Sequence, residues 1–158
     1  MKAVTAKELK LELNNRSPKE VLELCLRLSR FKKENKELLT YLLFEASDEE
    51  YYINSVKKEI DLKFEKVNKK SPYFIRKSIR TILAHTRKYI RYSQKKETEV
   101  ELLIYFCVRL KNFTPSIHHN KRVENLYYKL IDSIRKKVAA LHEDLQYDYT
   151  IEINDLLD

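Results

Sequence analysis

The side chains of this sequence whose type and spacing could do chemistry are mainly basic. From residue 66 to residue 96 no aspartate or glutamate occurs, and eleven of these 31 residues are lysine or arginine. Such side chains donate charge-assisted hydrogen bonds to phosphate and carboxylate oxygens, so the segment favours an anionic partner. Six of the eleven fall on one predicted helix and form our candidate anion-binding set: Arg76, Lys77, Arg80, Arg87, Lys88 and Arg91.

The six candidate residues share one face of that helix. At about 100° per residue they lie within about 120° of one another, and the aliphatic residues lie on the opposite side. A charged arc is often no more than a solvated helix face. Here no carboxylate is spaced to pair with the bases, and like charges at this spacing repel at a cost of about 0.3 kcal/mol per pair. The pattern therefore predicts an outward, purely cationic face that suits an anionic partner.

Two tyrosines near the cationic face are candidates for stacking on nucleic-acid bases. On the same helical wheel Tyr73 falls about 60° from Arg76, and Tyr92 falls about 160° from it. The alternative is that these rings belong to the core with their hydroxyls at its rim, which is common for aromatic residues at helical spacing.

The sequence carries no motif for catalysis or for a metal. It has no glycine, which excludes the phosphate-binding loops and nucleophile elbows that need backbone at positive φ. His118 and His119 are neighbours whose side chains point about 100° apart on a helix, and residues 142–146 do not form the H-E-x-x-H zinc motif. We therefore expect no catalytic residue, no metal and no cofactor, in a protein that is not an enzyme.

Both cysteines lie in apolar runs. Cys25 and Cys107 are each flanked by aliphatic or aromatic residues, which predicts two buried, inert thiols. Reactive thiols need a polar, electropositive setting. A disulfide and a reactive thiol stay open as alternatives.

Helices must position all of these residues. Apolar residues recur at spacings of three and four, and Ser17-Pro18-Lys19-Glu20 and Ser71-Pro72 have the form of helix starts. The pattern predicts an all-α fold of about seven helices in antiparallel pairs, either an irregular helical bundle or a short HEAT-like curl. The expected helices begin near Thr5 and then cover approximately residues 18–31, 37–46, 48–68, 72–92, 98–111 and 117–145.

Length and composition favour one soluble globular domain. Of 158 residues, 43% are hydrophobic and 35% are charged, which is too apolar for disorder and, without a long apolar run, too polar for a membrane span. We expect a single all-helical domain over residues 1–146, followed at 147–158 by an acidic, tyrosine-containing tail without helical periodicity. The charged N-terminus lacks the apolar segment of an export signal, so we expect a cytoplasmic protein without a membrane partner.

Two segments carry a resemblance to known sequences. Residues 36–45, Lys-Glu-Leu-Leu-Thr-Tyr-Leu-Leu-Phe-Glu, and residues 141–149, Leu-His-Glu-Asp-Leu-Gln-Tyr-Asp-Tyr, resemble parts of an uncharacterised all-helical bacterial protein family. The resemblance extends over most of the chain and implies an all-helical fold. That family has no assigned activity, so the resemblance implies no site residue.

Two functions fit these observations. The first is a non-enzymatic helical module whose cationic face binds an anionic macromolecule, most concretely the phosphate backbone of nucleic acid without reading its sequence. The second is a protein-interaction or scaffold domain that binds an acidic protein surface or associates with another copy of the chain. The acidic tail is expected to compete with an outside anion for the cationic face, and the alternatives are that it packs on the domain, meets another copy, or is a solvated end without effect.

Overall fold

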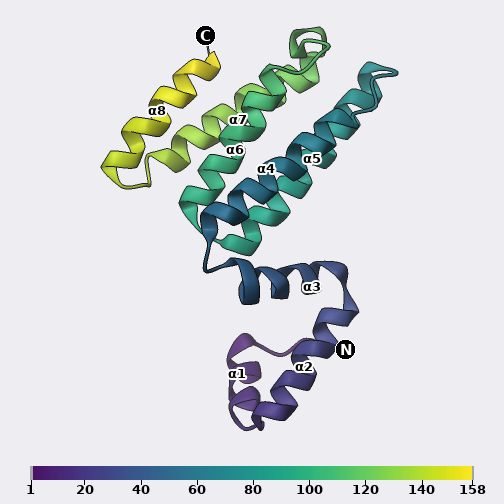
Figure 1. The fold of residues 1–158 in the computed structure, drawn as a ribbon, viewed down its shortest axis with the longest axis vertical. Helices are drawn as coiled ribbons and strands as arrows, with labels where there is room; N and C mark the ends of the chain where they lie inside the picture. Colours follow the sequence, from purple (N-terminus) through teal and green to yellow (C-terminus); the bar gives the residue numbers. More distant parts are fainter. Residues whose placement is uncertain (1, 158) are drawn as a thin grey trace. The chain divides into compact units, whose positions relative to one another are not determined.

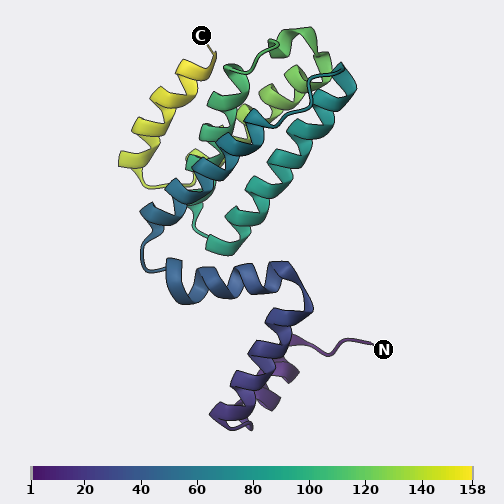
Figure 2. The same cartoon turned by 45° about the vertical axis from the view of Figure 1, so that its right-hand side comes forward.

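Helices account for 81% of the structure, a computed structural model that describes residues 2–157 and contains no strand among them. The all-α prediction is confirmed, although the described residues form eight α-helices where about seven are expected (Figures 1 and 2). The elements are α1 (Ala6–Asn14), α2 (Pro18–Phe31), α3 (Lys33–Thr40), a π-helical segment η1 (Tyr41–Glu45), α4 (Glu49–Glu65), α5 (Pro72–Ser93), α6 (Lys96–Lys111), a 3₁₀ turn η2 (Ile117–His119), α7 (Lys121–Val138) and α8 (Glu143–Leu157).

The chain divides into two compact units, Met1–Phe44 and Glu45–Asp158, which we call the N-terminal unit and the C-terminal unit. This division differs from the predicted one, a single domain over residues 1–146 with a tail. The sequence hides the boundary because it lies within η1, a helical segment without the proline, glycine or serine that marks most linkers.

Two complete capping boxes start α1 and α2 in the N-terminal unit, and α3 begins without a side-chain cap. The Thr5 hydroxyl accepts a hydrogen bond from the Glu8 backbone N–H at 3.3 Å, and the Glu8 carboxylate accepts one from the Thr5 N–H at 2.8 Å. Ser17 and Glu20 repeat this arrangement at the start of α2, with Pro18 at the first helical position. Each such cap stabilises a helix by about 1 kcal/mol. Both starts lie where the sequence predicts them.

A single residue separates α2 from α3. Lys32 has extended backbone, with φ −141° and ψ 145°, and α3 begins at Lys33 and packs against α2 (Figure 2). The polar segment 32–36 is predicted as a longer turn. Lysine, glutamate and asparagine have enough helix propensity to continue a helix once one residue has redirected the chain.

The central helix of the C-terminal unit is α6. It packs against α4, α5, α7 and α8, and its buried residues cover most of its circumference. Glu97, Glu101, Tyr105 and Val108 form a less buried side. The α5 helix packs against α4 and α6, so one of its faces is held inward. Fully buried side chains of this core include Ile60, Ile79, Leu102, Phe106, Leu110, Ile131, Ile134 and Ile153.

The predicted helix over residues 117–145 forms three elements. After η2 and α7 the chain turns at residues 139–142, and the Leu141 N–H bonds to the Val138 carbonyl at 2.9 Å. This turn contains neither glycine nor proline, so the sequence carries no stop signal there. Leu141 is buried, and its burial anchors the turn.

The predicted C-terminal tail is a docked helix, as far as the structure describes it. The α8 helix packs on α6 and α7 and buries Ile153 and Leu156. The Tyr127 hydroxyl donates to the Leu156 carbonyl, and the Lys111 ammonium donates to the Asp155 carbonyl, both at 2.7 Å. The expectation that residues 147–157 lack helical structure is wrong. Two buried apolar residues, Ile153 and Leu156, are enough to dock this helix although most of its other residues are polar or acidic.

Candidate anion-binding face

The α5 helix carries all six candidate bases, and local sequence determines where it begins and ends. The Ser71 hydroxyl caps it by accepting from the Phe74 N–H at 3.4 Å, and Pro72 occupies the first turn. At the other end Gln94 adopts a left-handed conformation with φ 58°. Glycine usually takes this position, and in a chain without glycine the amide side chain tolerates it at a modest energetic cost.

Burial of its aliphatic side determines the orientation of α5. Ile79 is 0% exposed and Ile82 is 3% exposed, and the remaining buried residues of this helix lie on the same face except Tyr92. The face that the sequence predicts to be buried is therefore buried in the structure. Rotating α5 to bury its bases would expose this aliphatic side.

The six candidate bases lie away from that buried side. Lys77, Arg80, Arg87 and Arg91 are exposed, and Arg76 and Lys88 are half-buried. At 1.5 Å of rise per residue, the distance along the helix from Arg76 to Arg91 is about 22 Å. The bases form two groups of three, one in each half of α5, and we call the six together the α5 cationic face.

Five members of the α5 cationic face form no ion pair with any residue between 2 and 157. These five are Arg76, Lys77, Arg80, Arg87 and Arg91. Unpaired bases at adjacent turns repel one another, which costs about 0.3 kcal/mol per pair in the folded chain. It is suited to a partner that brings negative charge.

Some bases on the neighbouring helices are paired with carboxylates, whereas α5 itself contains no aspartate or glutamate. Arg109 contacts the Asp61 carboxylate at 2.9 Å. The Lys137 ammonium lies 2.8 Å from the Glu99 carboxylate, and the Lys57 ammonium lies 2.6 Å from the Glu101 carboxylate. These pairs join helices that are distant in sequence, and sequence reasoning does not predict them.

The two candidate stacking tyrosines differ in exposure. Tyr73 is 56% exposed, and the Arg76 guanidinium carbon lies 5.5 Å from the centre of its ring. Tyr92 is 8% exposed and packs edge-on against Tyr89 with 6.0 Å between ring centres. A nucleic-acid base needs an open ring face for stacking, so only Tyr73 remains a candidate. Tyr92 fits the alternative of a core ring.

The remaining groups with chemical potential are dispersed. The His118 ring lies 2.9 Å from the Glu124 carboxylate, and the described residues hold no group of three metal-ligating side chains. Both cysteines are free thiols. Cys107 is buried, as predicted, and burial raises the pKa of its thiol to about 12. Cys25 is exposed, which contradicts the prediction, because the helices around it leave the apolar side of α2 open.

A groove with acidic walls lies between α4, α6 and α8, and sequence reasoning misses it. It has a volume of about 350 Å³, and three carboxylates line it, those of Glu101, Asp148 and Glu152. Burial, and then the nearby Glu101 carboxylate, raise the pKa of Glu152. The groove exists only because α8 is helical and docked, and the helical spacing of Asp148 and Glu152 was the signal that could have revealed it.

The chain matches no family model, no curated protein and no solved structure. No helix in the part of the chain that the structure describes is long and apolar enough to cross a membrane. Function must therefore be inferred from the geometry of this chain alone.

Proposed function

We propose that this protein is a non-enzymatic binding module whose α5 cationic face holds the phosphate backbone of nucleic acid. One observation carries the proposal: five bases on one outward helix face have no carboxylate partner within the described residues, and α5 itself contains no acidic residue that could supply one. An anionic macromolecule would supply the missing charge.

The chemistry of the face favours phosphate over a general anion. Four of its six bases are arginines, whose planar guanidinium groups bind phosphate oxygens through two parallel hydrogen bonds. The bases extend over about 22 Å of helix, which suits a partner with charges repeated along a line. Exposed Tyr73 beside Arg76 offers one ring for an unpaired base.

Binding through this face is expected to be independent of nucleotide sequence. Contacts to phosphate position a protein on nucleic acid, and contacts to base edges in a groove read its sequence. The face consists of long basic side chains, without the asparagine or glutamine that pairs with adenine edges. Affinity should therefore vary little among duplexes of equal length.

A salt titration tests the proposal. The logarithm of the association constant for a short duplex should fall linearly with the logarithm of salt concentration, with a slope of about −0.9 for each phosphate contacted. The double variant R80E/R87E should bind at least about tenfold more weakly at low salt while its stability changes by about 0.5 kcal/mol or less per substitution.

The matched control reverses two exposed bases outside the face. K58E/R135E changes the net charge by the same amount, on α4 and α7, and should retain most of the affinity. Equal losses in the two variants would mean that net charge alone causes binding. If neither DNA nor RNA is retained at low salt, the nucleic-acid proposal fails and an acidic protein surface becomes the partner to test.

A further inference from the structure

The N-terminal unit lacks a core of its own. No residue from Lys2 to Thr40 is buried, although α2 packs against α3. Helices of 9, 14 and 8 residues are marginal in water without apolar contacts. Twelve large apolar side chains of this unit are exposed, against nine in the much longer C-terminal unit: Val4, Leu9, Leu11, Leu13, Leu22, Leu24, Leu26, Leu28, Phe31, Leu42, Leu43 and Phe44.

Eight of these side chains lie on α1 and α2, and five of the eight are spaced as two stripes. Leu24, Leu28 and Phe31 are spaced as one stripe on α2, and Leu9 and Leu13 are spaced one turn apart on α1. Their exposures range from 41% for Leu24 to 77% for Phe31. We call these five residues the α1–α2 face.

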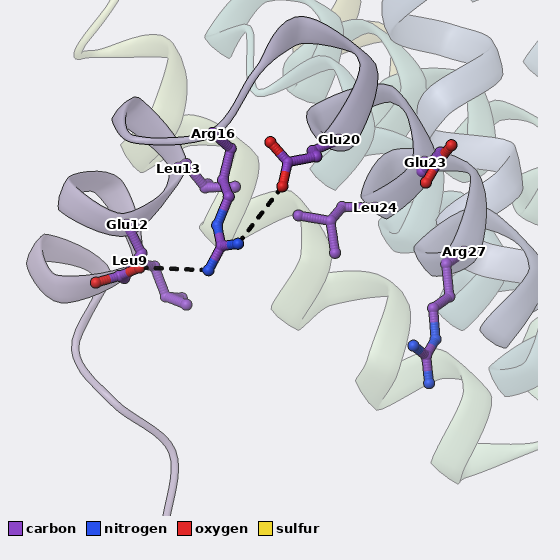
Figure 3. Close-up of a pocket in the computed structure, with 8 residues that line it drawn as sticks. All are labelled: Leu9, Glu12, Leu13, Arg16, Glu20, Glu23, Leu24 and Arg27. Atoms are coloured by element: carbon purple, nitrogen blue, oxygen red, sulfur yellow. Dashed lines mark ion pairs between the residues drawn. The ribbon is translucent and has the colours of Figure 1, made fainter.

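A groove runs between the two helices of this face. Leu9, Leu13 and Leu24 line it, and its volume is about 520 Å³ (Figure 3). Arg16 forms ion pairs at 3.6 Å with carboxylates on both walls, which ties the helices together at this end. The groove is therefore formed by α1, α2 and the turn between them. Its three leucines are exposed, so no other part of the unit covers them.

The exposed apolar area of the α1–α2 face matches that of a dimer interface. At about 170 Å² for a fully exposed large apolar residue, the five residues expose roughly 450 Å². A standard interface buries about 800 Å² on each partner, of which about 60%, or roughly 480 Å², is apolar. One copy of this face thus supplies about the apolar area that one side of a stable dimer needs.

The charges of α2 are complementary to those of an antiparallel copy. Its carboxylates, Glu20 and Glu23, lie in its first half, which has a net charge of −1 because Lys19 lies there too, and its guanidinium groups, Arg27 and Arg30, lie in its second half. Glu23 and Arg27 both lie on the rim of the groove, apart from the Arg16 network, and the described residues give neither of them an ion pair (Figure 3). Two antiparallel copies of α2 would set the acidic half of each beside the basic half of the other.

We propose that the α1–α2 face is the interface of a homodimer, with a two-fold axis crossing the middle of α2. An isologous interface requires a surface that is complementary to itself, and this face combines apolar area with charges of opposite sign in its two halves. The α5 cationic face lacks that property because two copies of it repel. A membrane is the less suitable occupant, since helices that lie on anionic lipid carry mainly basic residues on their polar side.

The mass of the full chain in solution tests the proposal. Sedimentation equilibrium in nucleic-acid-free buffer should show the dimer mass at concentrations between about 10 and 100 µM, the range in which weak dimers are populated. The variant L24E/F31E should weaken dimerisation at least about tenfold, as should L9E/L13E on the other wall of the groove. The control L62E alters a leucine of α4 that is 47% exposed and should leave dimerisation unchanged.

Charge exchange tests the antiparallel arrangement. The variants E23R and R27E/R30E should each dimerise more weakly than the wild type, because each makes the polar side of α2 predominantly one sign. Mixing the two should restore dimers, now containing one copy of each, which native mass spectrometry distinguishes by mass. Failure of the mixture to form heterodimers would overturn the charge pairing.

Three results would overturn the dimer itself. These are a monomer mass at 100 µM, equal dimerisation by L24E/F31E and L62E, or a monomer that binds vesicles of phosphatidylcholine and phosphatidylserine through the same leucines. None of these measurements involves nucleic acid, and α5 is unaltered in every variant. Failure of this proposal is therefore distinguishable from failure of the proposed function.

Discussion

The two units of this chain differ in how well their helices are capped and in how much of their apolar side chains is buried. The N-terminal unit has both complete capping boxes of the described helices, yet none of its residues up to Thr40 is buried. The C-terminal unit caps α6 without a side-chain hydrogen bond and packs four other helices against it. Caps worth about 1 kcal/mol decide where a helix begins, and burial worth about 1.5–3 kcal/mol per large side chain decides whether it stays folded. Well-capped helices without a core are consistent with the proposal that the α1–α2 face binds a second copy of the chain.

The two units also differ in which side of a helix is left without a partner. In α2 the uncovered side is apolar, and the polar side carries both signs of charge. In α5 the aliphatic side is covered, and all the charges on the uncovered side are basic. The first pattern favours association with a like surface, and the second favours an unlike, anionic one. The following predictions test how far this contrast in burial reaches.

Removing α8 should have the largest effect on stability. Truncation after Gln146 deletes Ile153 and Leu156, which are 2% and 5% exposed, together with the hydrogen bond from Tyr127. Loss of two buried side chains should lower the free energy of unfolding by about 3–6 kcal/mol. Differential scanning fluorimetry should show a clear fall in melting temperature.

Two point variants in α8 sharpen that prediction. I153S should reproduce much of the loss, and I151S should change little because Ile151 is 47% exposed. A truncated chain that melts at the wild-type temperature would mean that the segment acts as a free acidic tail. In that case it should compete with nucleic acid for the α5 cationic face, and truncation should tighten binding at low salt.

A pair of alanine variants compares the units directly. F106A in the C-terminal core removes a ring that is 0% exposed and should cost about 3–5 kcal/mol in urea unfolding. L22A in α2 removes a side chain that is 58% exposed and lies outside the α1–α2 face, so it should cost about 0.5 kcal/mol or less. Equal costs would show that α2 has a core that the structure lacks.

Sequence reasoning predicts helices well where signals are local. The starts at Ser17 and Ser71 and the inward side of α5 follow from caps and from apolar spacing, and all three are observed. The turn before α8 and the boundary inside η1 escape prediction because neither contains proline or glycine. Both features depend on contacts between residues distant in sequence, which periodicity does not encode.

In the candidate site, too, the features that depend on local sequence are predicted and those that depend on tertiary contacts are not. The exposure of Arg80 and Arg87 follows from the helical wheel alone. The absence of ion pairs at these bases depends on which acidic residues the neighbouring helices bring close, and only the fold determines that. Tyr92 is buried although its position on the wheel is near the basic side, because the wheel does not describe how other helices pack on α5. Cys25 is exposed for the converse reason, since an apolar stripe predicts burial only if something covers it.

The smallest predicted effect concerns Glu152 in the acidic groove, and its sign follows from proton linkage. Burial, and then repulsion from Glu101, raise the pKa of the Glu152 carboxyl in the folded chain. The folded state therefore binds a proton more tightly than the unfolded state does, and its stability decreases as the pH rises through that pKa. E152Q removes the ionisation, so the variant should match the wild type at about pH 3.5 and melt at a slightly higher temperature at pH 7. The opposite result would be an E152Q variant that is less stable than the wild type at pH 7 and equal to it at low pH. Attraction to Lys57 would then outweigh burial and the repulsion from Glu101, and the pKa of Glu152 would be lowered, not raised.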